Sequence, residues 1–289
     1  MTICLITGSS GFIGSHLLEE LVKLDYEIYT ADITDGQDLC DPNFTSDLPD
    51  VDIIFHLAAV NGTWKFYDKP WEVGKNNILP TLNLLERYRT TSAKFIFAST
   101  CEIFNGAIDL GVGMVPTDEE IPVMFNDIRN PRWSYSIPKA LGENLVANSG
   151  LDYLVLRFFN IYGPRQTDHF ISEFYDRMVK ESNPTIIGND TRSFCYVKDA
   201  VQLTIEVSQK AKNEILNIGR EDEIKIADVA QLIMELSGFG TNSLNVQPSP
   251  IGSVSRRCPN MAKTMKYLND FVYTELKDGL KLTLASYKQ

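Results

Sequence analysis

The sequence has few residues of the kinds that hold metal ions or disulfide frameworks. Its three histidines, His16, His56 and His169, show no spacing typical of metal ligands. Its five cysteines are scattered, and no Cys-x-x-Cys pair occurs. An odd number of isolated cysteines is typical of reduced thiols in a cytosolic protein. We therefore expect no metal site and no disulfide framework.

The sequence also lacks long apolar runs and an excess of basic residues, which argues against membrane and nucleic-acid binding. No apolar run approaches the roughly 20 residues of a membrane-spanning helix, and Gly8 interrupts the apolar start too early for a signal peptide. Basic residues are in deficit, since 27 lysines and arginines face 38 acidic residues, for a formal net charge of -11. Such a chain is a poor partner for nucleic acid or an anionic membrane surface. The sequence predicts a cytoplasmic protein that binds neither.

Short apolar runs alternate with helical stripes along the first half of the chain. The runs predict strands at 2–7, 26–32, 51–57, 95–99 and 153–157, and the stripes predict helices at 12–24, 75–88 and 133–148. This alternation predicts an α/β fold with a doubly wound parallel sheet, the Rossmann fold. The pattern loosens after about residue 160. We predict a first domain over 1–160 that also includes part of 190–220, and a smaller C-terminal lobe made mainly of 161–289. The Gly-, Ser-, Asn- and Pro-rich segment 238–255 is expected to be loop.

A glycine-rich motif, Gly8-Ser-Ser-Gly11-Phe12-Ile13-Gly14, lies between the first predicted strand and helix. The first glycine permits a tight turn, the second lets the backbone approach a pyrophosphate, and the third lets the helix pack close to the strand. The helix N-terminus then faces the phosphates. The alternative, a glycine-rich turn without a ligand, is less typical of this position. We therefore predict a dinucleotide site that includes Phe12 and Ile13.

Further cofactor contacts are expected at the ends of the next two strands. Asp32 ends the second strand, where a carboxylate can accept hydrogen bonds from ribose hydroxyls and would repel a 2′-phosphate. NAD is therefore favoured over NADP, although a surface turn aspartate is the alternative. Asp38 and Leu39 follow and can flank the adenine. Leu57, Ala58 and Ala59 end the third strand, where small residues let a cofactor lie across the sheet edge.

Tyr135 and Lys139 lie four residues apart in the segment Ser-Tyr-Ser-Ile-Pro-Lys. On a helix this spacing puts both side chains on one face, about one turn apart. An ammonium beside a phenol favours the phenolate and so makes the tyrosine a better base. The pair alone is a weak signal, but it gains weight downstream of a dinucleotide motif.

These features together resemble the extended short-chain dehydrogenase/reductase family, in its branch of nucleotide-sugar epimerases, dehydratases and decarboxylases. The resemblance covers most of the chain. It rests on the glycine motif and on the segments His56–Ala59, Asn77–Thr81, Ser99-Thr100, Tyr135–Lys139, Arg157–Pro164 and Arg192–Asp199. It implies a bound NAD contacted also by Asn77, Tyr135 and Lys139, a nucleoside-diphosphate sugar substrate held mainly by the 161–289 lobe, and a homodimer formed through the Tyr135 helix.

The resemblance also implies the chemistry. Thr100, Tyr135 and Lys139 would be the catalytic trio, with Tyr135 taking the proton of the sugar O4 while NAD takes the C4 hydride. Asn160 would contact the sugar nucleotide. Arg192 and Arg257 would bind its diphosphate, unless they are solvated surface residues. Pro138 departs from the usual Ser or Thr, and we expect it to be tolerated in a first helical turn.

The residues after Thr100 bear on the exact reaction. Cys101 and Glu102 make a Thr-Cys-Glu sequence that resembles the Thr-Asp-Glu or Thr-Ser-Glu of dehydratases and the Thr-Ser-Glu of glucuronate decarboxylases. Glu102 would be a base at C5 and Cys101 an acid at the C6 oxygen. Alternatively, Cys101 is a small buried residue and Glu102 only a hydrogen-bonding carboxylate. The reading slightly favours a dehydratase. A 4-epimerase, a UDP-glucuronate-type decarboxylase, a carbonyl reductase and a non-catalytic NAD-binding scaffold stay open.

Two segments are predicted to be loops without assigned chemistry. Residues 61–67, rich in aromatics, follow the third strand and would either line the sugar pocket or pack as a lid. Residues 106–133 contain an acidic run and are expected to be exposed.

Overall fold

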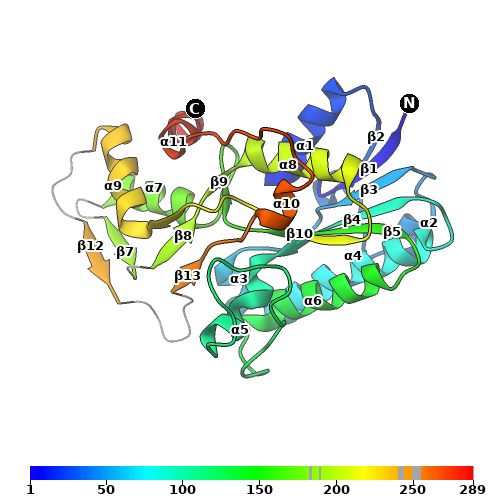
Figure 1. Cartoon of the computed structure of the whole chain (residues 1–289), viewed down its shortest axis with the longest axis horizontal. Helices are drawn as coiled ribbons and strands as arrows, with labels where there is room; N and C mark the ends of the chain where they lie inside the picture. Colours follow the sequence, from blue (N-terminus) through cyan, green and yellow to red (C-terminus); the bar gives the residue numbers. More distant parts are fainter. Residues whose placement is uncertain (182–183, 189, 240–243, 249–254, 289) are drawn as a thin grey trace.

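A parallel β-sheet forms the centre of the computed structural model, which describes residues 1–181, 184–188, 190–239, 244–248 and 255–288 (Figure 1). Its six strands pair in the order β10-β5-β4-β3-β1-β2, and all neighbours run parallel. The strand order reverses at β1, since β2 and β3 pair on its opposite sides. Ligands of such sheets bind beyond the carboxyl ends of the strands at this point. The strands are β1 (Ile3–Thr7), β2 (Glu27–Ala31), β3 (Ile53–His56), β4 (Lys94–Thr100), β5 (Asp152–Phe158) and β10 (Glu214–Ile218).

Helices cover both faces of this sheet (Figure 1). On one face α1 packs beside α8, and on the other α4 packs along α6 with α2 next to it. The apolar stripe of α1 explains its placement, because Leu17 and Leu21 are fully buried. Burial of one such side chain contributes about 1.5–3 kcal/mol. The predicted doubly wound fold is thus confirmed. The bounds are α1 (Phe12–Lys23), α2 (Pro42–Ser46), α4 (Pro70–Tyr88), α6 (Trp133–Ala147) and α8 (Val197–Lys210).

A smaller group of elements lies beside the sheet, at the left of Figure 1. It contains α7 (Phe170–Lys180), β7 (Thr185–Ile187), β8 (Thr191–Ser193), β11 (Glu223–Lys225), α9 (Ile226–Ser237), β12 (Asn245–Gln247) and β13 (Arg256–Arg257). Short connecting elements complete the fold: η1 (Ile33–Asp35), α3 (Thr63–Asp68), η2 (Cys101–Phe104), α5 (Asn105–Asp109), β6 (Ile161–Tyr162), β9 (Cys195–Tyr196), α10 (Ala262–Met265) and α11 (Leu276–Tyr287). Because β10 joins the large sheet and α8 packs on α1, part of 190–220 lies with the first half of the chain.

Three predicted loops contain structure. Residues 63–68 form α3, because Phe66 is buried there. The 106–133 segment is not wholly exposed, since Thr117 and Glu119 are buried and Thr117 bridges to Pro259. Strand β12 interrupts 238–255 by pairing with β7, while 240–243 and 249–254 lie outside the described residues. Within the described residues, no helix combines the length and apolarity that a bilayer span requires.

Pro138 lies deeper in its helix than expected. Helix α6 begins at Trp133, so Pro138 falls in the second turn and cannot donate to the carbonyl of Ser134. The helix continues through it because α6 packs along α4 and against β4 and β5. Tertiary packing here outweighs local propensity.

Candidate active site

The loop between β1 and α1 brings backbone close to the place of a ligand phosphate. Gly8 has a φ of 71°, and a Cβ there would lie 2.7 Å from the backbone nitrogen of Ala58. A Cβ on Gly14 would lie 2.0 Å from the carbonyl oxygen of Gly8. No side chain caps α1, whose N-cap is Gly11, so its first amides and positive dipole end are available to an anion. Phe12 and Ile13 start this helix and are half-buried against the core. The loop therefore fits a pyrophosphate.

Asp32 lies directly beside this loop. Its Oδ2 accepts a hydrogen bond from the amide of Ser10 at 2.9 Å, and its Oδ1 accepts from the amide and hydroxyl of Thr34 at 3.0 and 2.9 Å. A carboxylate has about four acceptor sites, so one is left for a ribose hydroxyl. Asp32 thus supports the glycine loop and fits NAD.

The remaining predicted cofactor residues differ in what they can contact. Residues 57–59 follow β3 at the carboxyl edge of the sheet. Asn77 of α4 is buried, and its amide pairs with the backbone of Val60 at 3.2 and 2.9 Å, which braces the chain after β3. Asp38 is exposed and accepts from a backbone amide, whereas Leu39 is part of the core. Asn77 and Leu39 therefore act on the site through the fold.

Thr100, Tyr135 and Lys139 meet at the carboxyl end of β4. Thr100 is the last residue of that strand, and its hydroxyl lies near the phenol of Tyr135, whose pKa it lowers. Tyr135 and Lys139 share the buried face of α6, with the lysine Nζ 6.0 Å from the centroid of the tyrosine ring. The lysine Nζ donates to the carbonyl of Ala98 at 2.7 Å. The structure thus brings the three residues together.

Burial outweighs the expected effect of Lys139 on the pKa of Tyr135 in the protein alone. Burial raises the pKa of Tyr135, and Glu102 and Cys101 raise it further, against a lowering contribution from Thr100. Burial also lowers the pKa of Lys139 to about 7. The ammonium donates to a backbone carbonyl and not to the phenol, so burial dominates the pKa of Tyr135 in the protein alone.

Glu102 lies between two arginines in the turn after β4. Its Oε1 is 2.7 Å from Nη2 of Arg257. Its Oε2 accepts from Nη2 and Nε of Arg132 at 3.0 and 3.2 Å, and also from Asn105. Burial would raise the pKa of Glu102, but Arg257 and Arg132 outweigh it and lower the pKa to about 2. Glu102 is therefore a carboxylate at neutral pH.

Several hydrogen-bond donors surround this carboxylate. Within the described residues, the buried Nε of Arg257 and Nδ2 of Asn160 have no hydrogen-bond partner, and Arg257 Nη2 meets Glu102 without hydrogen-bond alignment. Burial and the charge of Arg257 lower the pKa of Arg192 to about 10. Burial raises the pKa of the Cys101 thiol, against a lowering contribution from the nearby Asn160 backbone. The predicted substrate residues thus gather around Cys101 and Glu102.

Two residues of the site were not predicted. Arg132 precedes Tyr135 by three positions, so the helical spacing that identified Lys139 also places it within one turn of the tyrosine. Phe66 of α3 stacks on Tyr135, with ring centroids 5.1 Å apart and an interplanar angle of 10°. Its segment was predicted to be a loop whose aromatics line the sugar pocket or pack as a lid, and the stack on Tyr135 itself was not predicted.

The chain has relatives of known family along almost its whole length. The family model described as NAD dependent epimerase/dehydratase family matches residues 4–219. A UDP-N-acetyl-alpha-D-glucosaminuronate decarboxylase of Bacillus cytotoxicus is 32% identical, over 99% of this chain and 98% of its own. A putative UDP-glucose 4-epimerase of Methanocaldococcus jannaschii is 30% identical, over 96% and 95%.

A solved structure agrees with these matches. The UDP-glucuronic acid 4-epimerase from Bacillus cereus, in complex with UDP-glucuronic acid and NAD, superposes with a TM-score of 0.85 at 26% identity and 99% coverage of both chains. The glycine loop and Asp32 of this chain fit the same cofactor. The chain belongs to the NAD-dependent epimerase/dehydratase family, whose enzymes act on nucleotide sugars with NAD.

Proposed function

We propose that this protein is an NAD-dependent decarboxylase of a nucleoside-diphosphate uronate. The observation that carries the proposal is the buried cluster of Arg132, Glu102 and Arg257 next to Thr100 and Tyr135. Guanidinium groups bind carboxylates in a bidentate manner, so Arg132 of this cluster suits a sugar that carries a carboxylate. The similarity to the Bacillus cytotoxicus decarboxylase supports the same choice.

The catalytic trio would begin the reaction at C4 of the sugar. NAD, when bound, accepts the C4 hydride and later returns it. Tyr135 takes the proton of the O4 hydroxyl, and Thr100 hydrogen-bonds the same oxygen. Lys139 would bind the nicotinamide ribose. Because burial raises the pKa of Tyr135 in the protein alone, the phenol needs Thr100 and Lys139 beside it to act as a proton acceptor.

The substrate would be bound by Arg192, Arg257 and Asn160, which lie around Cys101 and Glu102. Arg192 and Arg257 would hold the diphosphate, and the Asn160 amide would contact the sugar nucleotide. The Nε of Arg257 and the Nδ2 of Asn160 are buried, and leaving such donors unpaired costs roughly 1–3 kcal/mol each. Ligand oxygens would remove that cost. Both arginines belong to 161–289, the part that we propose as the substrate lobe.

The charge of Glu102 weighs against a dehydratase after C4 oxidation. A dehydratase, slightly favoured by the sequence, requires a base at C5, and a carboxylate whose pKa is about 2 is a weak base. Decarboxylation requires none. The C5–C6 bond breaks, its electron pair moves toward the C4 carbonyl, and carbon dioxide leaves. A proton then goes to C5, and the Cys101 thiol can supply it because its raised pKa keeps it protonated.

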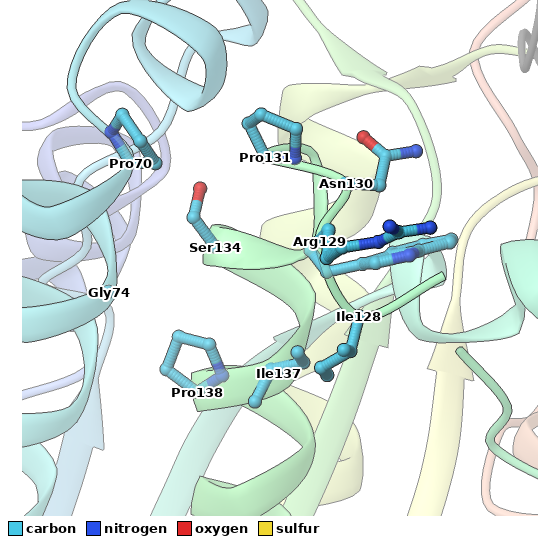
Figure 2. A pocket seen from close by; sticks show the side chains of 10 residues that line it. Pro70, Gly74, Ile128, Arg129, Asn130, Pro131, Ser134, Ile137 and Pro138 are labelled. Atoms are coloured by element: carbon cyan, nitrogen blue, oxygen red, sulfur yellow. The ribbon is translucent and has the colours of Figure 1, made fainter. Parts of the chain in front are cut away.

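We also propose a homodimer formed through α4 and α6. Leu82 of α4 and Leu141 of α6 are 41% and 46% exposed on neighbouring helices. A groove of about 370 Å³ lies on this side, and none of the proposed catalytic residues lines it (Figure 2). Ile128 and Ser134 border it, and a second copy would cover both.

A labelled sugar tests the proposed reaction. The NAD-loaded protein would be incubated with UDP-glucuronate and UDP-N-acetylglucosaminuronate labelled with carbon-13 at C6, and with UDP-glucose as the neutral control. We expect labelled carbon dioxide from a uronate and none from the control. Loss of water would identify a dehydratase, and unchanged mass with inverted C4 would identify a 4-epimerase. Unchanged sugars despite bound NAD would favour the scaffold.

A further inference from the structure

A buried carboxylate outside the proposed chemistry follows the catalytic lysine on α6. Glu143 is four residues after Lys139, which places it on the same helix face about one turn away. Glu143 is only 6% exposed. Its Oε1 accepts hydrogen bonds from the hydroxyl of Ser99 and from Nε of Arg157, and its Oε2 accepts from Nη2 of Arg157 at 2.7 Å. Glu143 therefore joins the helix to two strands of the sheet.

The partners of Glu143 reach the catalytic end of β4. Ser99 immediately precedes Thr100 in that strand. Arg157 of β5 is 4% exposed, donates to the carbonyl of Glu119 at 2.8 Å and lies 4.8 Å from the centroid of the Phe104 ring. A buried ion pair contributes little net stability, because desolvation offsets its attraction. Stability alone is a weak reason for this pair.

Among the described residues, the carboxylate of Glu143 acts on the pKa of Lys139. The lysine is 1% exposed, and its Nζ lies 4.8 Å from the centroid of the Phe97 ring. Burial lowers its pKa to about 7, and Glu143 opposes this effect. Tyr135, on the same helix, stays protonated because its pKa is raised. His56 of β3 is neutral because burial and the charge of Lys139 lower its pKa to about 3.

Charges on the other elements that pack on α6 are engaged elsewhere or exposed. Arg157 of β5 pairs with Glu143, and Glu102 of η2 pairs with Arg132 and Arg257. On α4, Arg87 pairs with Asp50, and the other charged residues are exposed: Glu72, Lys75 and Glu86. On α3, Lys65 lies over the ring of Trp64, and Asp68 is exposed. Among the described residues, Glu143 is the anion that raises the pKa of Lys139, although it also pairs with Arg157.

We propose that Glu143 is a positioning residue for the reaction at C4. From one turn beyond Lys139 it keeps the lysine ammonium charged, and through Ser99 it holds the Thr100 end of β4 against the Tyr135 helix. The inference rests on the proposed role of Lys139 in the family's reaction. It concerns the charge of that lysine and is independent of which sugar is the substrate.

The titration of Lys139 itself tests this inference. The full chain, loaded with NAD and labelled with carbon-13 at lysine Cε, would be followed by NMR over pH, and the Lys139 signal identified by its loss in Lys139→Arg. In Glu143→Gln we expect the titration midpoint to fall by about one pH unit, since a neighbouring opposite charge is lost. Glu143→Asp should restore most of it. Ser99→Ala removes the hydrogen bond but keeps the charge, so its midpoint should match the wild type. An unchanged midpoint in Glu143→Gln would overturn the inference.

A second variant covers the case in which Glu143→Gln does not fold, because it leaves Arg157 buried and unpaired. The double variant Glu143→Gln with Arg157→Gln removes an anion and a cation together, so its midpoint should fall by less than in the single variant but stay below that of the wild type. With a substrate that the enzyme converts, the alkaline limb of the pH–rate profile should move to lower pH by as much as the Lys139 midpoint does. Absence of any turnover would contradict the proposed decarboxylase but leave the NMR result intact, so the two failures are distinguishable.

Discussion

The phenol ring of Tyr135 lies parallel to the ring of Phe66, with centroids 5.1 Å apart. The two residues come from α6 and α3, which pack on each other. The stack fixes the ring plane of the tyrosine, and Thr100 lies near its hydroxyl. A proton acceptor held in this way is ready for a substrate hydroxyl without reorientation.

Removal of the phenolic hydroxyl should abolish turnover but not cofactor binding. In Tyr135→Phe the ring and its stack on Phe66 remain, while the general base is lost. We expect turnover to fall by at least about a hundredfold. NAD content, measured after gel filtration, should match the wild type. Full activity of this variant would remove Tyr135 from the mechanism.

Loss of the stacking ring should have a smaller effect on the same step. Phe66→Ala leaves the hydroxyl in place but frees the ring of Tyr135, at a cost of about 0.5–1.5 kcal/mol. We expect kcat to fall by up to about tenfold, with little change in KM. Trp64→Ala on the same helix is the matched control, because Trp64 is 55% exposed. Equal effects of the two substitutions would contradict a specific role for the stack.

Arg132 should discriminate between uronates and the bare diphosphate. If it contacts the sugar carboxylate, Arg132→Gln should weaken uronate binding by about 10- to 100-fold, the range for a charged hydrogen bond of 1.5–3 kcal/mol. The affinity for UDP, which carries the diphosphate but no carboxylate, should change little when it is measured by calorimetry. Arg129→Gln is the control, since Arg129 is 86% exposed and pairs only with Asp127 among the described residues. An equal loss for UDP and uronate would contradict the assignment.

The cofactor half of the site could be predicted from the sequence, because its motifs depend on residues that are close together in the chain. The spacing of Gly8, Gly11 and Gly14 after an apolar run predicts the turn that the structure has. The four-residue spacing of Tyr135 and Lys139 likewise places both on one helix face. Local rules of backbone geometry are sufficient for such features.

The electrostatics of the site depend on contacts that sequence does not encode locally. Arg257 reaches Glu102 from the far end of the chain through β13. With Arg132, that contact lowers the pKa of Glu102 to about 2 and so makes the predicted base a weaker one. Similarly, the depth of burial around Tyr135 reversed the expected direction of its pKa. Desolvation depends on the whole fold, so spacing alone cannot give it.

A charge on the outer face of α6 should dissociate the proposed dimer. Leu141 is 46% exposed next to α4, and an aspartate there would be buried without a partner in a helix-bundle interface. We expect Leu141→Asp to sediment as a monomer, whereas the wild type sediments as a dimer. Leu282→Asp on α11, where the leucine is 53% exposed, should remain dimeric. A monomeric wild type would contradict the dimer.

His56 should make the protein sensitive to acid. It is 1% exposed, and its ring nitrogens lie 2.8 and 3.0 Å from the hydroxyls of Thr7 and Thr81. Burial lowers its pKa from 6.5 to about 3 in the folded protein. Below pH 6.5 the unfolded chain therefore binds a proton that the folded chain does not, so stability falls as the pH decreases toward 3.

The size of this effect can be measured by urea unfolding. Between about pH 7.5 and about pH 5, the linkage of His56 should lower the free energy of unfolding by about 2 kcal/mol. His56→Gln, which cannot take the proton, should be less stable near neutrality but should lose about that much less on acidification. Thr81→Val keeps the histidine while removing one of its partners, so it should retain the steep acid dependence. If His56→Gln shows the same acid dependence as the wild type, another buried group must account for it.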